Sequence, residues 1–298
     1  MFQTTFPIRP LVLLFALTLL ADKYALANEP LSSEQRTQCE QLLLDSLNEQ
    51  GEWSSVHAAE YLIRLDKRRP VLAAFQPQTE NASAPFRIGV WRVLAQAEAT
   101  LDKQREAIEK IRHVLLDKHA TDRLHALESL AKLNEPINSP AELQVVQQMS
   151  AANDPGCSFA LWRMFQQRPS AQLLQKLTQQ LHSPDAVARL RAGFVLSQLD
   201  ELPAKFHLLA QQTLAKEPID SAAYPYIASA CGNATLKKLL ASQDPNHQAL
   251  AIRELARRSQ SIDLDLTQAL SAETPLALRQ AAAFALLARD TNTSNMQP

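Results

Sequence analysis

Small and apolar residues recur along the chain with the spacing of an α-helix. If the first residue of each copy is counted as place zero, places four and five are small or apolar and place eight is leucine. Because an α-helix turns once every 3.6 residues, these places fall on one side of it. Each copy is therefore predicted to be a helix that packs through this side. The clearest copies are residues 54–65, 122–133, 188–199 and 278–289.

Weaker copies fit the same frame, and a second periodic stretch lies between most neighbouring copies. The place-four residues of successive copies are about thirty residues apart, so each repeat is predicted to be a hairpin of two helices. One hairpin cannot bury its apolar side alone, so neighbouring hairpins must stack to form a core. The weaker copies are residues 85–96, 156–167, 220–231 and 247–258, and the second stretches are residues 35–47, 102–116, 141–149, 170–181, 203–214 and 264–270.

Capping residues and prolines mark where these helices begin. Ser32 and Gln35 have the spacing of a capping box, in which the two residues exchange hydrogen bonds between side chain and backbone. Further along, Ser183-Pro184-Asp185 and Asp244-Pro245 separate periodic stretches. Asp and Ser cap a first helical turn, and proline is tolerated within it, so we expect helices to begin at these breaks.

The copy at residues 188–199 reads ARLRAGFVLSQL, which resembles the second helix of HEAT-like repeats, commonly V-R-x-x-A-A-x-A-L-G-x-L. The resemblance covers roughly residues 34–289. It implies an all-α fold, a right-handed α-solenoid of about eight HEAT-like helical hairpins, shaped as a curved rod whose second helices line the concave side. Gly89, Tyr224 and Pro225 depart from the pattern, and Pro225 makes the sixth unit irregular. The resembling residues pack the repeat, so they imply a fold and no activity.

The first residues have the organisation of a signal peptide. Arg9 precedes the unbroken apolar run 11–20, and Ala25-Leu26-Ala27 supplies the small residues of a cleavage site. We expect cleavage after Ala27 and export to the periplasm or the extracellular space. A retained membrane anchor is the alternative, and Asp22 and Lys23 disfavour it because they would lie inside a longer span.

The predicted organisation has three parts: a signal peptide at residues 1–27, a repeat solenoid at residues 28–289 and a polar C-terminal tail at residues 290–298. No segment after the first is long and apolar enough to span a membrane, so we expect no membrane span after cleavage. The chain carries a formal net charge of −1 with a pI near 6.7, which argues against nucleic acid as a partner.

The sequence lacks the common motifs of nucleotide binding, nucleophilic catalysis and metal-dependent hydrolysis. It contains no P-loop, no G-x-G-x-x-G, no G-x-S-x-G and no H-E-x-x-H, so no cofactor and no catalytic residues are predicted. Cys39, Cys157 and Cys231 are far apart and lack the spacing of a metal site, and we interpret them as buried core residues. The chain is therefore predicted to be a binding protein rather than an enzyme.

One group of polar residues stands out on the second helices of the first three repeats. Place three points away from the packed side, and in the first and third units it is a histidine followed one turn later by a carboxylate. The unit between them adds two arginines and a tryptophan. Because adjacent helices pack about 8–10 Å apart, these residues should form one patch. The patch consists of His57, Glu60, Arg87, Trp91, Arg92, His125 and Glu128.

Four interpretations of this patch compete. It is a solvated face with ion pairs between repeats, a site for a protein partner anchored by exposed Trp91, a site for a small polar ligand such as a sugar, or a metal-assisted catalytic site. His57 and His125 should lie about 16–20 Å apart, too far to share one ion, so no metal site is assigned. We predict an exported scaffold that binds a protein partner through its concave face, with ligand binding or metal-assisted catalysis as the alternative.

Aromatic residues occupy place six in the later units, in line with Trp91. They form either a stripe along the groove or packing contacts between neighbouring repeats, and packing is favoured because place six lies at the edge of the buried side. These residues are Trp162, Phe194, Tyr226 and Phe284.

Overall fold

The computed structural model describes residues 31–49, 52–199, 202, 204–216, 224–262 and 264–294. Within these ranges the regular structure is entirely helical, with fifteen α-helices and two 3₁₀ turns, which confirms the all-α prediction. None of the described helices combines the length and hydropathy that a membrane crossing requires. The predicted signal peptide at residues 1–27 lies outside the described residues.

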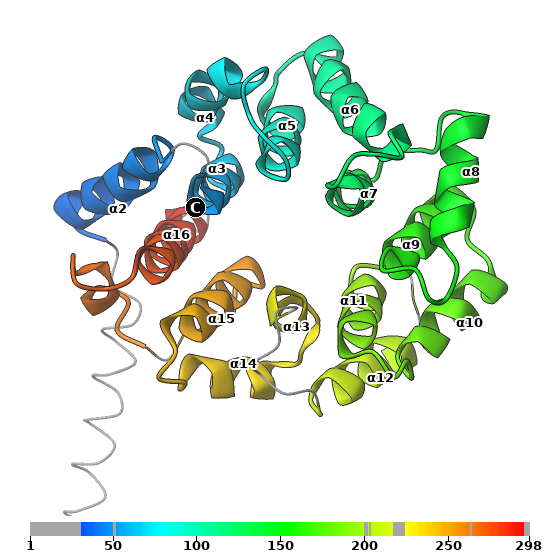
Figure 1. The fold of residues 1–298 in the computed structure, drawn as a ribbon. Coiled ribbons are helices and arrows are strands. Elements are labelled where there is room, and N and C mark those ends of the chain that lie inside the picture. Colours follow the sequence, from blue (N-terminus) through cyan, green and yellow to red (C-terminus); the bar gives the residue numbers. More distant parts are fainter. Residues whose placement is uncertain are drawn as a thin grey trace, which may run out of the picture.

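Along the chain, helices alternate between an outer and an inner row (Figure 1). The outer row consists of α2 (Ser33–Ser46), α4 (Arg68–Phe75), α6 (Leu101–Leu116), α8 (Pro140–Met149), α10 (Ala171–Gln180), α12 (Ala204–Leu214) and α14 (Asn233–Leu240). The inner row consists of α3 (Trp53–Arg64), α5 (Phe86–Ala97), α7 (Arg123–Lys132), α9 (Cys157–Gln167), α11 (Ala186–Ser197), α13 (Tyr224–Ala230), α15 (Pro245–Arg257) and α16 (Leu276–Ser294). The 3₁₀ turns are η1 (Gln76–Gln78) and η2 (Gln268–Leu270).

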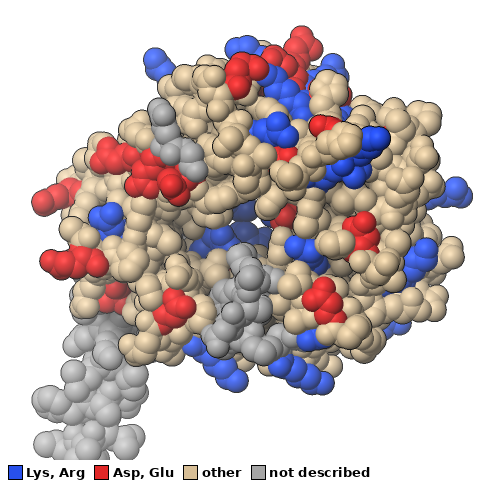
Figure 2. Space-filling view, in the orientation of Figure 1, with Lys and Arg blue, Asp and Glu red and all other residues tan. Residues whose placement is uncertain are grey.

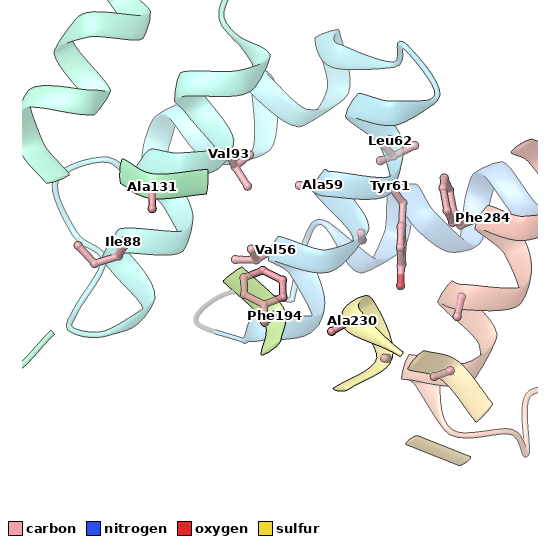
Figure 3. Close-up of a cluster of buried hydrophobic side chains, with 14 of the residues drawn as sticks. Val56, Ala59, Tyr61, Leu62, Ile88, Val93, Ala131, Phe194, Ala230 and Phe284 are labelled. Atoms are coloured by element: carbon pink, nitrogen blue, oxygen red, sulfur yellow. The ribbon is translucent and has the colours of Figure 1, made fainter. Parts of the chain in front are cut away.

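The two ends of the described chain meet, so the helices form a closed ring (Figure 1). Helix α16 packs against both α2 and α3. The ring of Tyr61 on α3 stacks on that of Phe284 on α16, with centroids 4.6 Å apart, as Figure 3 shows. Arg36 on α2 forms an ion pair of 2.5 Å with Asp290 on α16. The resemblance to HEAT-like repeats implied an open curved rod, and the closed ring corrects that expectation.

The composition of α16 explains the closure. Every residue from 281 to 287 is apolar and buried, so this helix has apolar side chains around its whole circumference. A helix of that kind must be covered on more than one side. It packs against α15 and η2, which precede it in the chain, and against α2 and α3, which come from the other end of the described chain.

The predicted capping residues are present where the helices begin. The Ser32 hydroxyl accepts a hydrogen bond from the Gln35 backbone N–H, and the Ser32 N–H donates to the Gln35 side chain, both at 3.1 Å. Asp185 and Asp244 cap α11 and α15, each accepting a hydrogen bond through one carboxylate oxygen from the backbone N–H two residues later. These caps satisfy backbone donors that a first helical turn leaves without partners.

Small residues at place four bring the inner helices close to their neighbours. Ala58, Ala126, Ala192 and Ala282 are all fully buried, as the repeat pattern predicted. The three cysteines are also buried and unpaired with one another, which agrees with their interpretation as core residues.

A buried ionic cluster fixes α6, α8 and α9 to one another. Glu142, 1% exposed, accepts hydrogen bonds from Arg112 at 2.7 Å and from Arg163 at 2.6 Å. The backbone N–H of Asn138 donates to the same carboxylate at 2.9 Å. Buried charges are stable only when paired and hydrogen-bonded in this way.

The structure differs from the repeat pattern at a few places. Residues 264–270 were predicted to be helical, but only the turn η2 forms there. Helices α4 and α14 were not predicted, although they complete the outer row. Helix α16 extends to Ser294, and so includes the first part of the segment 290–298 that was predicted to be a tail.

Candidate functional site: a cavity at the centre of the ring

The inner row surrounds a cavity of about 1280 Å³. Figure 2 shows the hollow at the centre of the ring, with Lys and Arg side chains inside it. All eight inner helices contribute residues to its wall. The face that was expected to be an open concave surface is therefore the wall of a central cavity.

Five of the seven residues predicted for the patch line this cavity: His57, Glu60, Arg92, His125 and Glu128. They lie on α3, α5 and α7, which are neighbours in the inner row, as the repeat spacing predicted. The structure thus brings together the two His-x-x-Glu pairs and one of the two arginines.

Trp91 and Arg87 do not belong to the cavity wall. Trp91 is only 9% exposed, and its indole N–H donates to the Thr79 carbonyl oxygen at 3.0 Å. Arg87 covers the Trp91 ring at 5.7 Å and forms two hydrogen bonds with Asp122, at 2.8 and 2.9 Å. The expectation of an exposed Trp91 that anchors a partner on the concave face is therefore wrong.

A shift of one residue in the repeat frame explains this error. In the other seven copies, the residue at place six lines the cavity. In α5 the cavity residues are Arg92, one position after Trp91 at place six, and Gln96 one turn later. Counting from Gly89 as the small residue therefore placed the α5 frame one residue too early.

Glu60 is the centre of one charged group in the cavity. Arg92 donates to one of its carboxylate oxygens through Nη2 at 2.7 Å and Nε at 3.2 Å, and His57 Nδ1 is 3.5 Å from the other. Arg92 also donates to the Ser129 hydroxyl at 3.2 Å. Burial alone raises the pKa of Glu60, but the charge of Arg92 and the bond with His57 outweigh it and hold that pKa well below its ordinary value.

Glu128 is the centre of a second charged group. Lys132, one turn later on α7, donates to one carboxylate oxygen at 2.6 Å, and the Tyr226 hydroxyl donates to the other at 3.1 Å. Burial raises the pKa of Glu128, but the charge and hydrogen bond of Lys132 lower it below its ordinary value. The same surroundings raise the pKa of Tyr226, mainly through burial and the nearby carboxylate.

The aromatic residues at place six both pack on one another and line the cavity. Ring centroids of Trp162 and Phe194 are 5.9 Å apart, and those of Phe194 and Tyr226 are 5.2 Å apart. The contacts confirm the interpretation of packing between neighbouring repeats. Phe284 contacts Tyr61 across the ring closure, and all four place-six aromatics reach the cavity wall.

Sequence reasoning missed three arginines in the wall: Arg64 on α3, and Arg253 and Arg257 on α15. Arg257 bonds Glu254 on its own helix at 2.7 and 3.0 Å. Burial, followed by the like charge of Arg257, lowers the pKa of Arg64. The repeat frame contained a signal for all three. Arg64 and Arg257 occupy place ten, as does the cavity residue Lys132, and Arg253 occupies place six.

The cavity wall carries five Lys or Arg side chains and three carboxylates, although the whole chain has a formal net charge of −1. In the described part of the chain, no three His, Cys, Asp or Glu residues are grouped so that they could hold a metal ion. The chemistry that this arrangement favours is therefore the binding of polar and negatively charged groups.

No protein-family model matches this chain, and no curated protein matches its sequence.

Proposed function

We propose that this chain is an exported binding protein that holds a polar ligand in the cavity of a closed ring of HEAT-like hairpins. In this proposal, residues 1–27 direct export. Each outer helix forms a hairpin with the inner helix that follows it, and η2 with α16 completes eight hairpins in a right-handed α-solenoid. The repeat pattern of the sequence and the alternation of outer and inner helices support this interpretation.

The observation that carries the proposal is the central cavity itself. Ligand sites in proteins are concave, with mainly apolar and aromatic walls and a few polar groups, and they are commonly about 300–1,000 Å³ in volume. The cavity of about 1280 Å³ has room for such a ligand, and its wall combines aromatic rings with arginines and paired carboxylates. Five residues of the patch singled out in the sequence are part of it.

A ligand is favoured over a protein partner because of the closure of the ring and the position of Trp91. The partner interpretation relied on an exposed tryptophan on a concave face, whereas Trp91 is buried and the inner helices surround a cavity. Binding is favoured over metal-assisted catalysis because Glu60, Glu128 and Glu254 are each engaged by arginine or lysine.

A cavity-filling substitution tests the proposal. Gln198 directly follows α11 and lines the cavity, so Gln198→Trp should occupy part of its volume. Gln175→Trp is the matched control, since Gln175 is exposed on the outer helix α10. Each protein is incubated with a small-molecule extract of its source cells, desalted and analysed by native mass spectrometry.

The proposal predicts a bound species of defined mass on the wild type and on Gln175→Trp that is strongly reduced on Gln198→Trp. Circular dichroism and thermal melting establish that both variants are folded. An absence of any bound species on all three proteins, or equal binding to all three, would count against a ligand site in the cavity.

A further inference from the structure

We infer that Arg64 and Arg253 form an anion subsite, so that the ligand of the cavity is an organic anion. This inference rests on the proposed function, since it names the class of molecule that the cavity holds. Both arginines line the cavity, one from α3 and the other from α15.

The pairing of charges in the cavity supports this assignment. Glu60 is bound by Arg92, Glu128 by Lys132, and Glu254 by Arg257 and Arg258. Every carboxylate in the wall is therefore already engaged. Within the described ranges, neither Arg64 nor Arg253 has a carboxylate oxygen within the 4.0 Å of an ion pair. Two permanent positive charges thus remain in the wall without an acidic partner.

Mutual repulsion among the arginines makes this part of the cavity favourable for an anion. After the larger effect of burial, the charges of Arg257 and Arg253 lower the pKa of Arg64, whereas the charges of Glu60 and Glu254, which lie beyond ion-pair distance, raise it. Because guanidinium groups remain charged at neutral pH, the chain cannot relieve the repulsion by losing a proton. A carboxylate, sulfonate or phosphate between them relieves it and accepts several charge-assisted hydrogen bonds.

Closure of the ring creates the subsite. Helices α3 and α15 are at opposite ends of the described chain, and α16 packs against both of them. The Tyr61 hydroxyl lies close enough to Arg253 for the charge of that arginine to lower its pKa, against the larger opposing effect of burial. An open rod would keep Arg64 and Arg253 apart, so the anion site belongs to the closed form.

Aromatic side chains beside the arginines determine what the rest of the ligand can be. Tyr61 precedes Arg64 by one helical turn, and its ring stacks on Phe284, which also lines the cavity. Tyr226 reaches the wall from α13. A flat or apolar body attached to the anionic group can contact these rings, whereas a bare inorganic ion contacts only the arginines.

Two fluorescent dyes that differ by one charged group test the inference. Anilinonaphthalene sulfonate is an aromatic anion, and phenylnaphthylamine is its neutral counterpart. Both are titrated against the mature wild-type chain, Arg64→Gln, Arg253→Gln and the control Arg105→Gln, whose side chain on α6 is 73% exposed. We expect each cavity substitution to weaken binding of the sulfonate about tenfold, as for the loss of one charge-assisted bond. Binding of the neutral dye and the behaviour of Arg105→Gln should be unchanged.

The results distinguish failure of the anion subsite from failure of the proposed function. Equal affinity of the sulfonate for the wild type and for both arginine variants overturns the anion subsite. If Gln198→Trp still blocks both dyes in that case, the cavity remains a ligand site and only the anion assignment fails. If Gln198→Trp blocks neither dye, the proposed function fails as well. Arg64 has no carboxylate at ion-pair distance to lose, so Arg64→Gln should melt at the temperature of the wild type. The same melting curve checks that the variant is folded.

Discussion

The hydroxyl of Tyr226 donates a hydrogen bond to the carboxylate of Glu128 across the central cavity, at 3.1 Å. The two residues are 98 positions apart and lie on α13 and α7, with α9 and α11 between them in the inner row. The bond therefore forms a chord of the ring.

Removal of this chord should destabilise the ring modestly. Tyr226→Phe removes the hydroxyl and keeps the aromatic contact with Phe194, while Glu128 remains paired with Lys132. We expect the free energy of unfolding to fall by about 0.5–1.5 kcal/mol, the net value of one hydrogen bond. Urea denaturation followed by circular dichroism measures the change. An unaltered midpoint would show that the chord contributes nothing to stability.

The ring closure should depend on Phe284. Phe284→Ala removes the ring that stacks on Tyr61 at the junction of the two chain ends. Truncation of a buried phenylalanine costs about 3–5 kcal/mol, so we expect a loss of that size in urea denaturation. Small-angle X-ray scattering should also show a larger radius of gyration as α16 separates from α3. Loss of stability without any expansion would mean that other contacts hold the ring closed.

The buried ionic cluster should be a major determinant of stability in the outer part of the ring. Glu142→Ala leaves Arg163, whose side chain is 0% exposed, and Arg112 without their shared carboxylate. Breaking a buried pair from one side costs about 3–5 kcal/mol, because an uncompensated charge remains inside the protein. The control Glu106→Ala, at an exposed position on α6, should change the unfolding free energy by less than about 0.5 kcal/mol. Similar effects of the two substitutions would contradict this account.

Acid should destabilise the protein partly through Glu60. Its pKa in the folded protein is held well below its ordinary value, because Arg92 and His57 outweigh the effect of burial. A depressed folded pKa gives stability that is fully present above the unfolded pKa and is lost as the pH falls through the folded value. Glu60→Gln should therefore be less stable than the wild type at pH 7, with the difference shrinking as the pH falls below about 4.3. Thermal melting at a series of pH values measures both curves, and a constant difference would contradict the assignment.

The helical class and the inner helices could be predicted because they follow from the local repeat. Small residues such as Ala58 and Ala126 recur with a fixed spacing, and the helix caps at Ser32 and Asp185 are local as well. The ring closure could not be predicted in this way. It depends on a contact between Tyr61 and Phe284, which lie near opposite ends of the described chain, and a repeat pattern relates only neighbours.

The candidate site was predicted in part. His57, Glu60, His125 and Glu128 were found because they occupy equivalent places in well-formed copies. Trp91 was misplaced because α5 is a weak copy whose frame is shifted by one residue. The arginine subsite was missed for a different reason: it assembles residues from α3 and α15, which become close only when the ring closes.

The most direct test of a ligand site in the cavity is a crystal structure of the mature chain with bound anilinonaphthalene sulfonate. The account predicts one dye inside the ring, with its sulfonate between the guanidinium groups of Arg64 and Arg253 and its rings beside Tyr61. Dye bound only on the outer helices, with the cavity free of it, would contradict the account.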